Sequence, residues 1–150
     1  MKRFTFAMAL VGLVVGGIAI AEKSISMEGI KCPVRGTAAK QEHAVKHLDG
    51  NVYFCCGNCP KKFEADKATY TTKANQQLVS TKQYEQGACP FSGKPLDAST
   101  AIDVNGTKVA FCCNICKGKA EKMKDEEKLT SIFGEKAFAK AKFAKVAEKK

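Results

Sequence analysis

Eight cysteines in a chain of 150 residues are the side chains best suited to chemistry. They form two groups with the same spacing: 22 residues separate the first cysteine from the second, and three separate the second from the last. One further cysteine directly follows the second in each group. Thiolate sulfur binds thiophilic ions such as Zn²⁺ and Cu(I). We therefore predict two metal sites, with candidate ligands Cys32, Cys55, Cys56 and Cys59, and Cys89, Cys112, Cys113 and Cys116.

The cysteine pattern is an internal repeat, because every cysteine of the first group recurs 57 positions later. The residues between the cysteines differ, so the two copies share a spatial requirement at the sulfur atoms. We predict a first unit over 32–67 and a second unit over 89–124. A connector over 68–88 joins them, and a helical region over 125–150 follows.

Each unit contains a hairpin signal that helps to position its cysteines. Asp49-Gly50 and Asn105-Gly106 are strong turn dipeptides, and each lies between short strand-forming stretches. The last three cysteines follow the second strand and lead into a helical stretch. Each unit is therefore expected to run from a cysteine turn to a hairpin, a second cysteine turn and a helix, which is a small α+β fold. The predicted strands are His43–Leu48, Asn51–Phe54, Ala101–Val104 and Thr107–Phe111.

The remaining segments carry weaker signals. Thr69–Gln86 is polar, and its periodicity does not distinguish a helical connector from a linker along the surface. Gly134 is expected to end a helix. Glu135–Lys150 is expected to form a solvated terminal helix with one or two phenylalanines docked on the body.

The C-C-x-x-C segments lie where a helix begins. The unpaired N–H groups and the positive end of the helix dipole favour a thiolate there. Cys56 and Cys59 also have a good spacing for metal binding, so Cys56 is a candidate fourth ligand. Adjacent cysteines point in different directions, however, so both members of a pair need not reach one ion.

The pattern Cys-x22-Cys-x3-Cys, present twice, resembles the TRASH domain, which is associated with heavy-metal sensing, trafficking and resistance. The segment from Val52 to Asp66, VYFCCGNCPKKFEAD, is similar to the related YHS domain. The resemblance covers about 32–67 and 89–124 and implies treble-clef-like units. It also implies a minimal set of three ligands in each unit, to which Cys56 and Cys113 are additions. The implied ligands are Cys32, Cys55 and Cys59, and Cys89, Cys112 and Cys116.

Two other interpretations of the cysteines remain open. An even number of cysteines in an exported chain is typical of disulfides, which would give a stapled interaction module without metal. Redox catalysis through C-x-x-C is the other, although a thioredoxin-like βαβ context is missing. His43 and His47 occur in the first unit only, so we expect them to be surface residues of a strand.

The N-terminal segment has the pattern of a secretory signal peptide over 1–21. Lys2 and Arg3 precede the uncharged segment Phe4–Ala21, which ends in the small-x-small triplet Ala19-Ile20-Ala21. We predict cleavage before Glu22 and a periplasmic or secreted protein. An uncleaved membrane anchor is the alternative, since a span needs about 20 apolar residues.

Lysine and arginine outnumber acidic residues by 25 to 15, which gives a formal net charge of +10. Such a charge is common in nucleic-acid-binding proteins, but export argues against that partner. The sequence shows no nucleophile–base–acid set, no paired-carboxylate motif and no phosphate-binding loop. We therefore expect a binding protein rather than an enzyme, with metal ions as partners and a signal sequence, if uncleaved, as its only membrane contact. The sequence identifies no protein partner.

Each predicted unit is small enough to need a staple. Domains below about 40 residues rarely fold without a metal, disulfide or partner, so metal is expected to stabilise both hairpins. The predicted apolar anchors are Val52, Phe54 and Phe63 in the first unit, and Val109, Phe111 and Met123 in the second.

Overall fold

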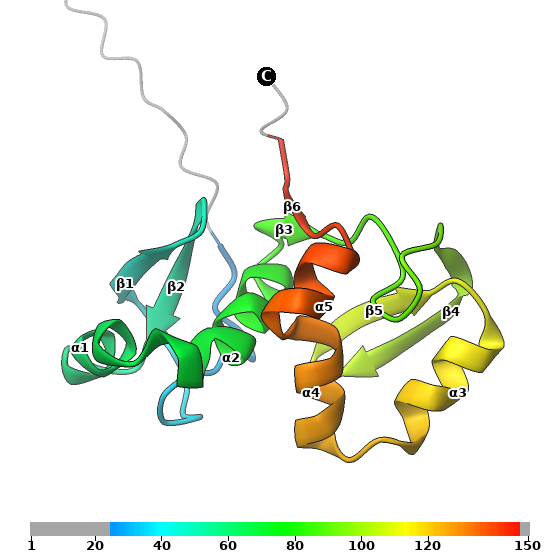
Figure 1. The fold of residues 1–150 in the computed structure, drawn as a ribbon. Helices are drawn as coiled ribbons and strands as arrows, with labels where there is room; N and C mark the ends of the chain where they lie inside the picture. The colour runs from blue at the N-terminus through cyan, green and yellow to red at the C-terminus, as the bar shows by residue number, and fades with distance from the viewer. Residues whose placement is uncertain (1–24, 148–150) are drawn as a thin grey trace, which may run out of the picture.

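The computed structural model describes residues 25–147 as an α+β protein of short antiparallel hairpins and helices (Figure 1). The predicted signal peptide and the last three residues lie outside this range. In both units a hairpin precedes a helix, and the hairpin strands of the second unit begin and end 57 residues after those of the first. The elements are β1 (Lys40–His47), β2 (Gly50–Phe54) and α1 (Asn58–Ala65), then β4 (Asp97–Val104), β5 (Thr107–Phe111) and α3 (Asn114–Lys122).

The hairpin turns agree with the sequence in one unit and differ by one residue in the other. Asn105 and Gly106 form the second turn with positive φ angles of 51° and 81°. The first turn falls at Leu48 and Asp49, with Leu48 at φ 52°, instead of at Asp49-Gly50. Gly50 is already the first residue of β2. The predicted first turn was therefore wrong by one position.

Gly50 is required by a close approach, which explains why it resembled a turn residue. A Cβ atom at this position would lie 2.7 Å from Leu78 Cδ2, a distance that real Cβ atoms essentially never show. The helix that follows α1 passes directly over the start of β2. The dipeptide thus marks a packing contact of the first hairpin.

A bulge in each hairpin aligns the outer strand with the residue before the cysteines. The register shifts between Lys40 and Ala44 in β1 and between Asp97 and Ile102 in β4. Past the shift, Lys40 pairs with Phe54, and Asp97 pairs with Phe111 in the second hairpin. Bulges bend a strand without ending its pairing. Both inner strands are therefore held at the point where they deliver a cysteine pair.

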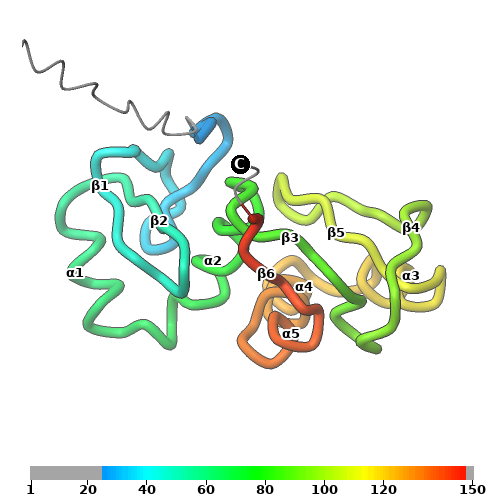
Figure 2. The backbone as a smooth tube through the Cα atoms, turned by 90° about the horizontal axis from the view of Figure 1, so that it is seen from above, coloured from blue at the N-terminus to red at the C-terminus, as the bar shows by residue number. Residues whose placement is uncertain are grey.

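The connector is a helix, α2 (Lys67–Ser80), which lies between the two hairpins (Figures 1 and 2). The side chain of Asp66 caps its start by accepting hydrogen bonds from the backbone and the hydroxyl of Thr69. Its inner face is buried although many of its residues are polar. The buried residues are Thr71, Ala74, Asn75, Gln77 and Leu78.

The C-terminal region forms α4 (Asp125–Phe133), α5 (Glu135–Lys140) and a short strand β6 (Ala144–Lys145), which pairs with β3 (Tyr84–Glu85). Gly134 ends α4 as predicted, and a Cβ atom there would lie 2.5 Å from Thr130 O. The predicted docking of two phenylalanines is confirmed, because the buried rings of Phe138 and Phe143 stack 4.5 Å apart. Ala141 between them is fully buried, so this region belongs to the core more than the sequence indicated.

A single hydrophobic core runs through both units. It combines side chains from the two hairpins with side chains from α2, α4 and α5. One predicted anchor was wrong: Met123 is half-buried just past α3, and Ala120 takes the position equivalent to Phe63. Fully buried core residues include Val52, Phe54, Phe63, Leu78, Val109, Phe111, Ile132 and Phe133.

Candidate metal centres

The structure brings six of the eight cysteines into two groups of three. Within each group, all Sγ atoms lie within 4.8 Å of one another, a distance over which one ion could bind all three. The three positions are the same in both units and are those that the family resemblance implies. The first cluster is Cys32, Cys55 and Cys59, and the second cluster is Cys89, Cys112 and Cys116.

A tight turn positions the first cysteine of each cluster. The backbone N–H of Gly36 donates a 2.8 Å hydrogen bond to Cys32 O, and Gly93 makes the same 2.8 Å bond to Cys89 O. Both glycines have positive φ angles, 72° and 71°, which side chains with a Cβ rarely adopt. The sulfur-bearing residues Cys32 and Cys89 are both buried.

The other cysteines of the first unit follow β2 and enter α1. The Sγ atom of Cys59 lies 3.6 Å from that of Cys55 and 3.5 Å from that of Cys56, and the last two are 4.0 Å apart. With Zn–S bonds of about 2.3 Å, the edge of a tetrahedron of sulfurs is about 3.8 Å. These separations therefore fit a thiolate-bound ion without rearrangement of the backbone.

The second unit repeats this arrangement with one difference in its surroundings. Cys112 Sγ lies 3.7 Å from both Cys113 Sγ and Cys116 Sγ, again close to the edge of a sulfur tetrahedron. The hydroxyl of Ser92 also contacts Cys112 Sγ, at 3.1 Å. The second cluster therefore has an oxygen neighbour beside its sulfurs.

None of the eight cysteines, all of which lie in the described part of the chain, forms a disulfide. A disulfide bond is about 2.05 Å long, whereas the sulfur contacts here run from 3.5 to 4.0 Å. The structure therefore gives no support to the alternative of a disulfide-stapled module.

Hydrogen bonding divides the thiols of the first unit into two classes. The backbone N–H of Asn58, followed by the Cys59 thiol, lowers the pKa of Cys56 to about 6. Burial, followed by hydrogen bonds to Cys56, raises the pKa of Cys59 above its usual range. Burial also acts to raise the pKa of Cys32, but backbone hydrogen bonds, led by that of Arg35, outweigh it and lower the pKa. A protonated Cys59 can thus donate to neighbouring thiolates.

The same division occurs in the second unit. Burial acts to raise the pKa of Cys89, but hydrogen bonds led by the Ser92 hydroxyl bring it down to about 6. Burial and then hydrogen bonding to Cys112 raise the pKa of Cys116 to about 12. The backbone N–H of Cys116 lowers the pKa of Cys113. Each cluster therefore contains thiolate that can receive a cation before all its protons have left.

The histidines lie outside both clusters, and one of them is less exposed than predicted. His43 is a partly exposed residue of β1, with Nε2 3.5 Å from a Glu42 carboxylate oxygen. His47 is half-buried: its Nε2 lies 2.9 Å from Asn75 Oδ1, and its ring meets the ring of Phe63 edge-on at 5.5 Å. The prediction of two surface histidines was therefore wrong for His47, because α2 covers that end of β1.

Sequence reasoning missed a glutamine that ties the first cysteine turn to its hairpin. Gln77 Oε1 accepts a 2.6 Å hydrogen bond from the backbone N–H of Tyr53, while Nε2 donates at 2.9 Å to the carbonyls of Tyr53 and Lys31. Lys31 directly precedes Cys32, and Tyr53 lies two residues before Cys55. The side chain thus fixes two cysteine-bearing segments relative to each other. No sequence pattern distinguishes Gln77 from the other polar residues of the connector.

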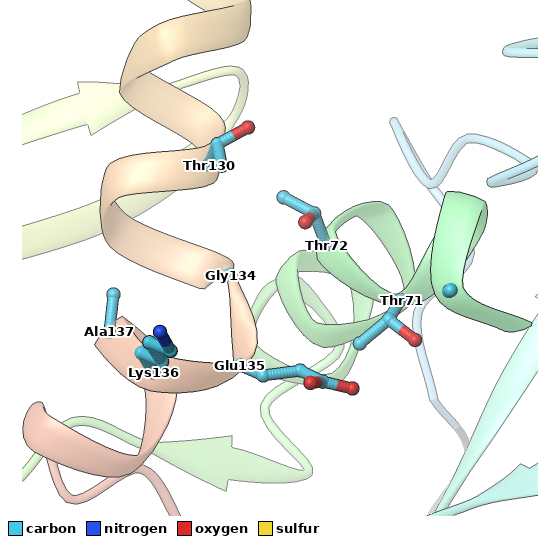
Figure 3. A pocket seen from close by; sticks show the side chains of 8 residues that line it. Thr71, Thr72, Thr130, Gly134, Glu135, Lys136 and Ala137 are labelled. Atoms are coloured by element: carbon cyan, nitrogen blue, oxygen red, sulfur yellow. The ribbon is translucent and has the colours of Figure 1, made fainter.

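A surface cleft of 430 Å³ lies between α2 and the corner of α4 and α5 (Figure 3). Thr71 and Thr72 of α2 face Thr130 and Glu135 across it. No cysteine lines this cleft. It is therefore separate from both clusters.

No family model, curated protein or solved structure matches the chain. Within residues 25–147, no helix is long and apolar enough to cross a bilayer. The functional argument therefore depends on the cysteine geometry itself.

Proposed function

We propose that the protein is exported and binds thiophilic metal ions through cysteine thiolates, in sensing, trafficking or stabilisation by metal. The observation that carries the proposal is the pair of three-sulfur clusters at equivalent positions of two repeated units. Two clusters built from separate turns, strands and helices are a costly arrangement for side chains that only pack. The same ligand geometry written twice supports a common role as ion sites.

The donor set restricts the cargo to soft or borderline ions. Sulfur donors suit Zn²⁺ and Cu(I) better than Mg²⁺ or Ca²⁺, which prefer oxygen. The sulfur separations near 3.8 Å match tetrahedral zinc, and three thiolates alone would also serve Cu(I). The residues that would hold the ion are those of the two clusters, with Cys56 and Cys113 as candidates for a fourth sulfur.

The order of elements supports a likeness to TRASH and YHS domains. Each unit runs from a cysteine turn through a hairpin and a cysteine pair into a helix, which is the order expected of a treble-clef-like unit. Export is supported by the N-terminal sequence, and we infer that the mature chain begins at Glu22 in the periplasm or outside the cell. Neither inference requires an enzymatic activity or a nucleic-acid partner.

Native mass spectrometry of the exported protein, purified with its redox state preserved, tests this function. We expect a mature chain starting at Glu22 that carries one ion per unit. A mass lower by two hydrogens for each pair of cysteines, without added metal, would instead establish the disulfide-stapled module. An N-terminus at Met1 in the membrane fraction would establish an uncleaved anchor.

A further inference from the structure

The two units differ at the cysteine that directly follows the second cluster residue. In the first unit Cys56 Sγ contacts two sulfurs, lying 3.5 Å from Cys59 Sγ and 4.0 Å from Cys55 Sγ. In the second unit Cys113 Sγ contacts that of Cys112, at 3.7 Å. Cys56 therefore closes one side of its cluster, whereas Cys113 lies beside one ligand of its own.

The backbone explains this difference. The carbonyl of Cys56 accepts a 3.2 Å hydrogen bond from the Cys59 N–H, and Gly57 before α1 is in the right-handed helical region. This turn folds Cys56 back toward the start of α1. Cys113 is instead extended (φ −169°, ψ 167°), α3 begins directly after it, and its carbonyl accepts from the N–H of Lys117. An extended residue ahead of the helix directs its side chain differently from one inside a turn.

The second cluster is also the more open of the two. Cys116 is half-exposed, whereas its counterpart Cys59 is 2% exposed. Ile115, directly before Cys116, is 84% exposed. The Ser92 hydroxyl at 3.1 Å from Cys112 Sγ is a hydrogen-bonding neighbour of the second cluster. Incoming molecules can therefore reach the sulfurs of the second unit more easily.

We propose that the two sites differ in kind, an inference that rests on the proposed function. The first unit encloses its ion with four sulfurs, whereas the second holds its ion with three and leaves one coordination position for an external ligand. Sites with four protein ligands are closed and structural, while three-ligand sites keep an open position. A thiol fits that position, because the cluster selects ions that prefer soft donors. The second unit is thus the site at which the ion is exchanged with a thiol-bearing carrier.

Alkylation of the zinc-loaded, reduced mature protein with iodoacetamide tests the proposal without any substitution. A metal-bound thiolate is a poor nucleophile, so zinc should slow the modification of Cys56 by about tenfold or more relative to the metal-free protein. Zinc should change the modification rate of Cys113 by less than about twofold. Peptide mapping by mass spectrometry separates the two sites, and metal content is measured before alkylation.

A matched pair of variants supplies an independent measurement. Cys56→Ser and Cys113→Ser change equivalent, half-exposed side chains. We expect Cys56→Ser to speed the release of one zinc ion to a chromophoric chelator by about tenfold or more, since a ligand is lost. Cys113→Ser should leave both release rates within about twofold of those of the unsubstituted protein.

The outcomes separate this inference from the function on which it rests. Equal zinc protection of Cys56 and Cys113, or equal acceleration by the two substitutions, would overturn the inequivalence and leave two zinc sites in place. A reduced protein that takes up no zinc before alkylation would overturn the proposed function together with the inference.

Discussion

Gln77 and Gln86 lie nine residues apart, yet they make the same three hydrogen bonds in units whose equivalent residues lie 57 apart. Gln86 Oε1 accepts at 2.9 Å from the N–H of Ala110, and its Nε2 donates to the carbonyls of Ala110 and Ala88, at 2.8 and 3.0 Å. Ala110 and Ala88 are the counterparts of the partners of Gln77 in the first unit. One short connector therefore secures both cysteine turns to their hairpins.

The substitution Gln77→Ala should lower the free energy of unfolding by about 2–3 kcal/mol, because it leaves buried backbone groups of Tyr53 and Lys31 without this partner. Urea denaturation of the reduced protein measures the change. Gln41→Ala, at an exposed position of β1, is the control and should stay within about 0.5 kcal/mol. Equal stability of the two variants would contradict the role given to Gln77.

Each cluster should lose its metal independently of the other. Cys59→Ser removes a ligand of the first cluster only, so the expected metal content falls from two ions to one. Cys116→Ser is the matched change in the second cluster and should have the same effect on stoichiometry. Native mass spectrometry under reducing conditions counts the ions. Loss of both ions from either variant would indicate a single site shared between the units.

The cysteine geometry could be predicted from sequence because the repeat fixes it. Spacing alone placed Cys55 and Cys59 at the exit of a strand and the start of a helix, where the structure has them. Glycine signals were less reliable. Gly106 lies in a turn for its positive φ angle, but Gly50 was mistaken for a turn residue because it makes room for Leu78.

The connection between the units could not be predicted in the same way. Helix α2 is polar over much of its length, and its buried face includes Asn75 and Gln77. Asn75 donates a 2.9 Å hydrogen bond to the carbonyl of Phe133, which links the connector to α4. Burial of such residues is decided by partners far away in the sequence. A periodicity of apolar residues cannot report them.

The reactivity of Cys56 in the metal-free protein should follow its lowered pKa. With a pKa of about 6, it stays a thiolate from pH 8 to pH 7, and its alkylation rate should fall only as the pH passes through about 6. Cys59, buried and with a raised pKa, is the internal control and should react far more slowly. Peptide mapping after short exposure to iodoacetamide gives both rates.

The same shift sets the sign of a stability effect. The pKa of Cys56 is lower in the folded chain than the ordinary 9.0, so its contribution to stability is complete above about pH 9 and is lost as the pH falls through about 6. An inflection of the Cys56 alkylation rate near pH 9 instead of pH 6 would show that the backbone N–H of Asn58 does not stabilise the thiolate.

Metal removal should weaken the fold without abolishing its cooperativity, contrary to what the size of each unit alone suggests. The core is continuous from the first hairpin through α2 and α4 to the second hairpin. Its side chains remain packed when the ions leave, so we expect the reduced, chelator-treated protein to unfold in one transition at a lower temperature. Hydrogen exchange of the amides in β2 and β5 should show protection of both hairpins.

Leu78→Ala tests whether this shared core carries the metal-free fold. Leu78 is 0% exposed, and loss of its side chain should cost about 2–5 kcal/mol. Because α2 contacts both inner strands, protection of β2 and β5 should fall together. Leu48→Ala, at a side chain 55% exposed, is the matched control and should stay within about 0.5 kcal/mol. If the metal-free protein showed no cooperative transition, or if only β2 lost protection in Leu78→Ala, the ions rather than the common core would hold the two units together.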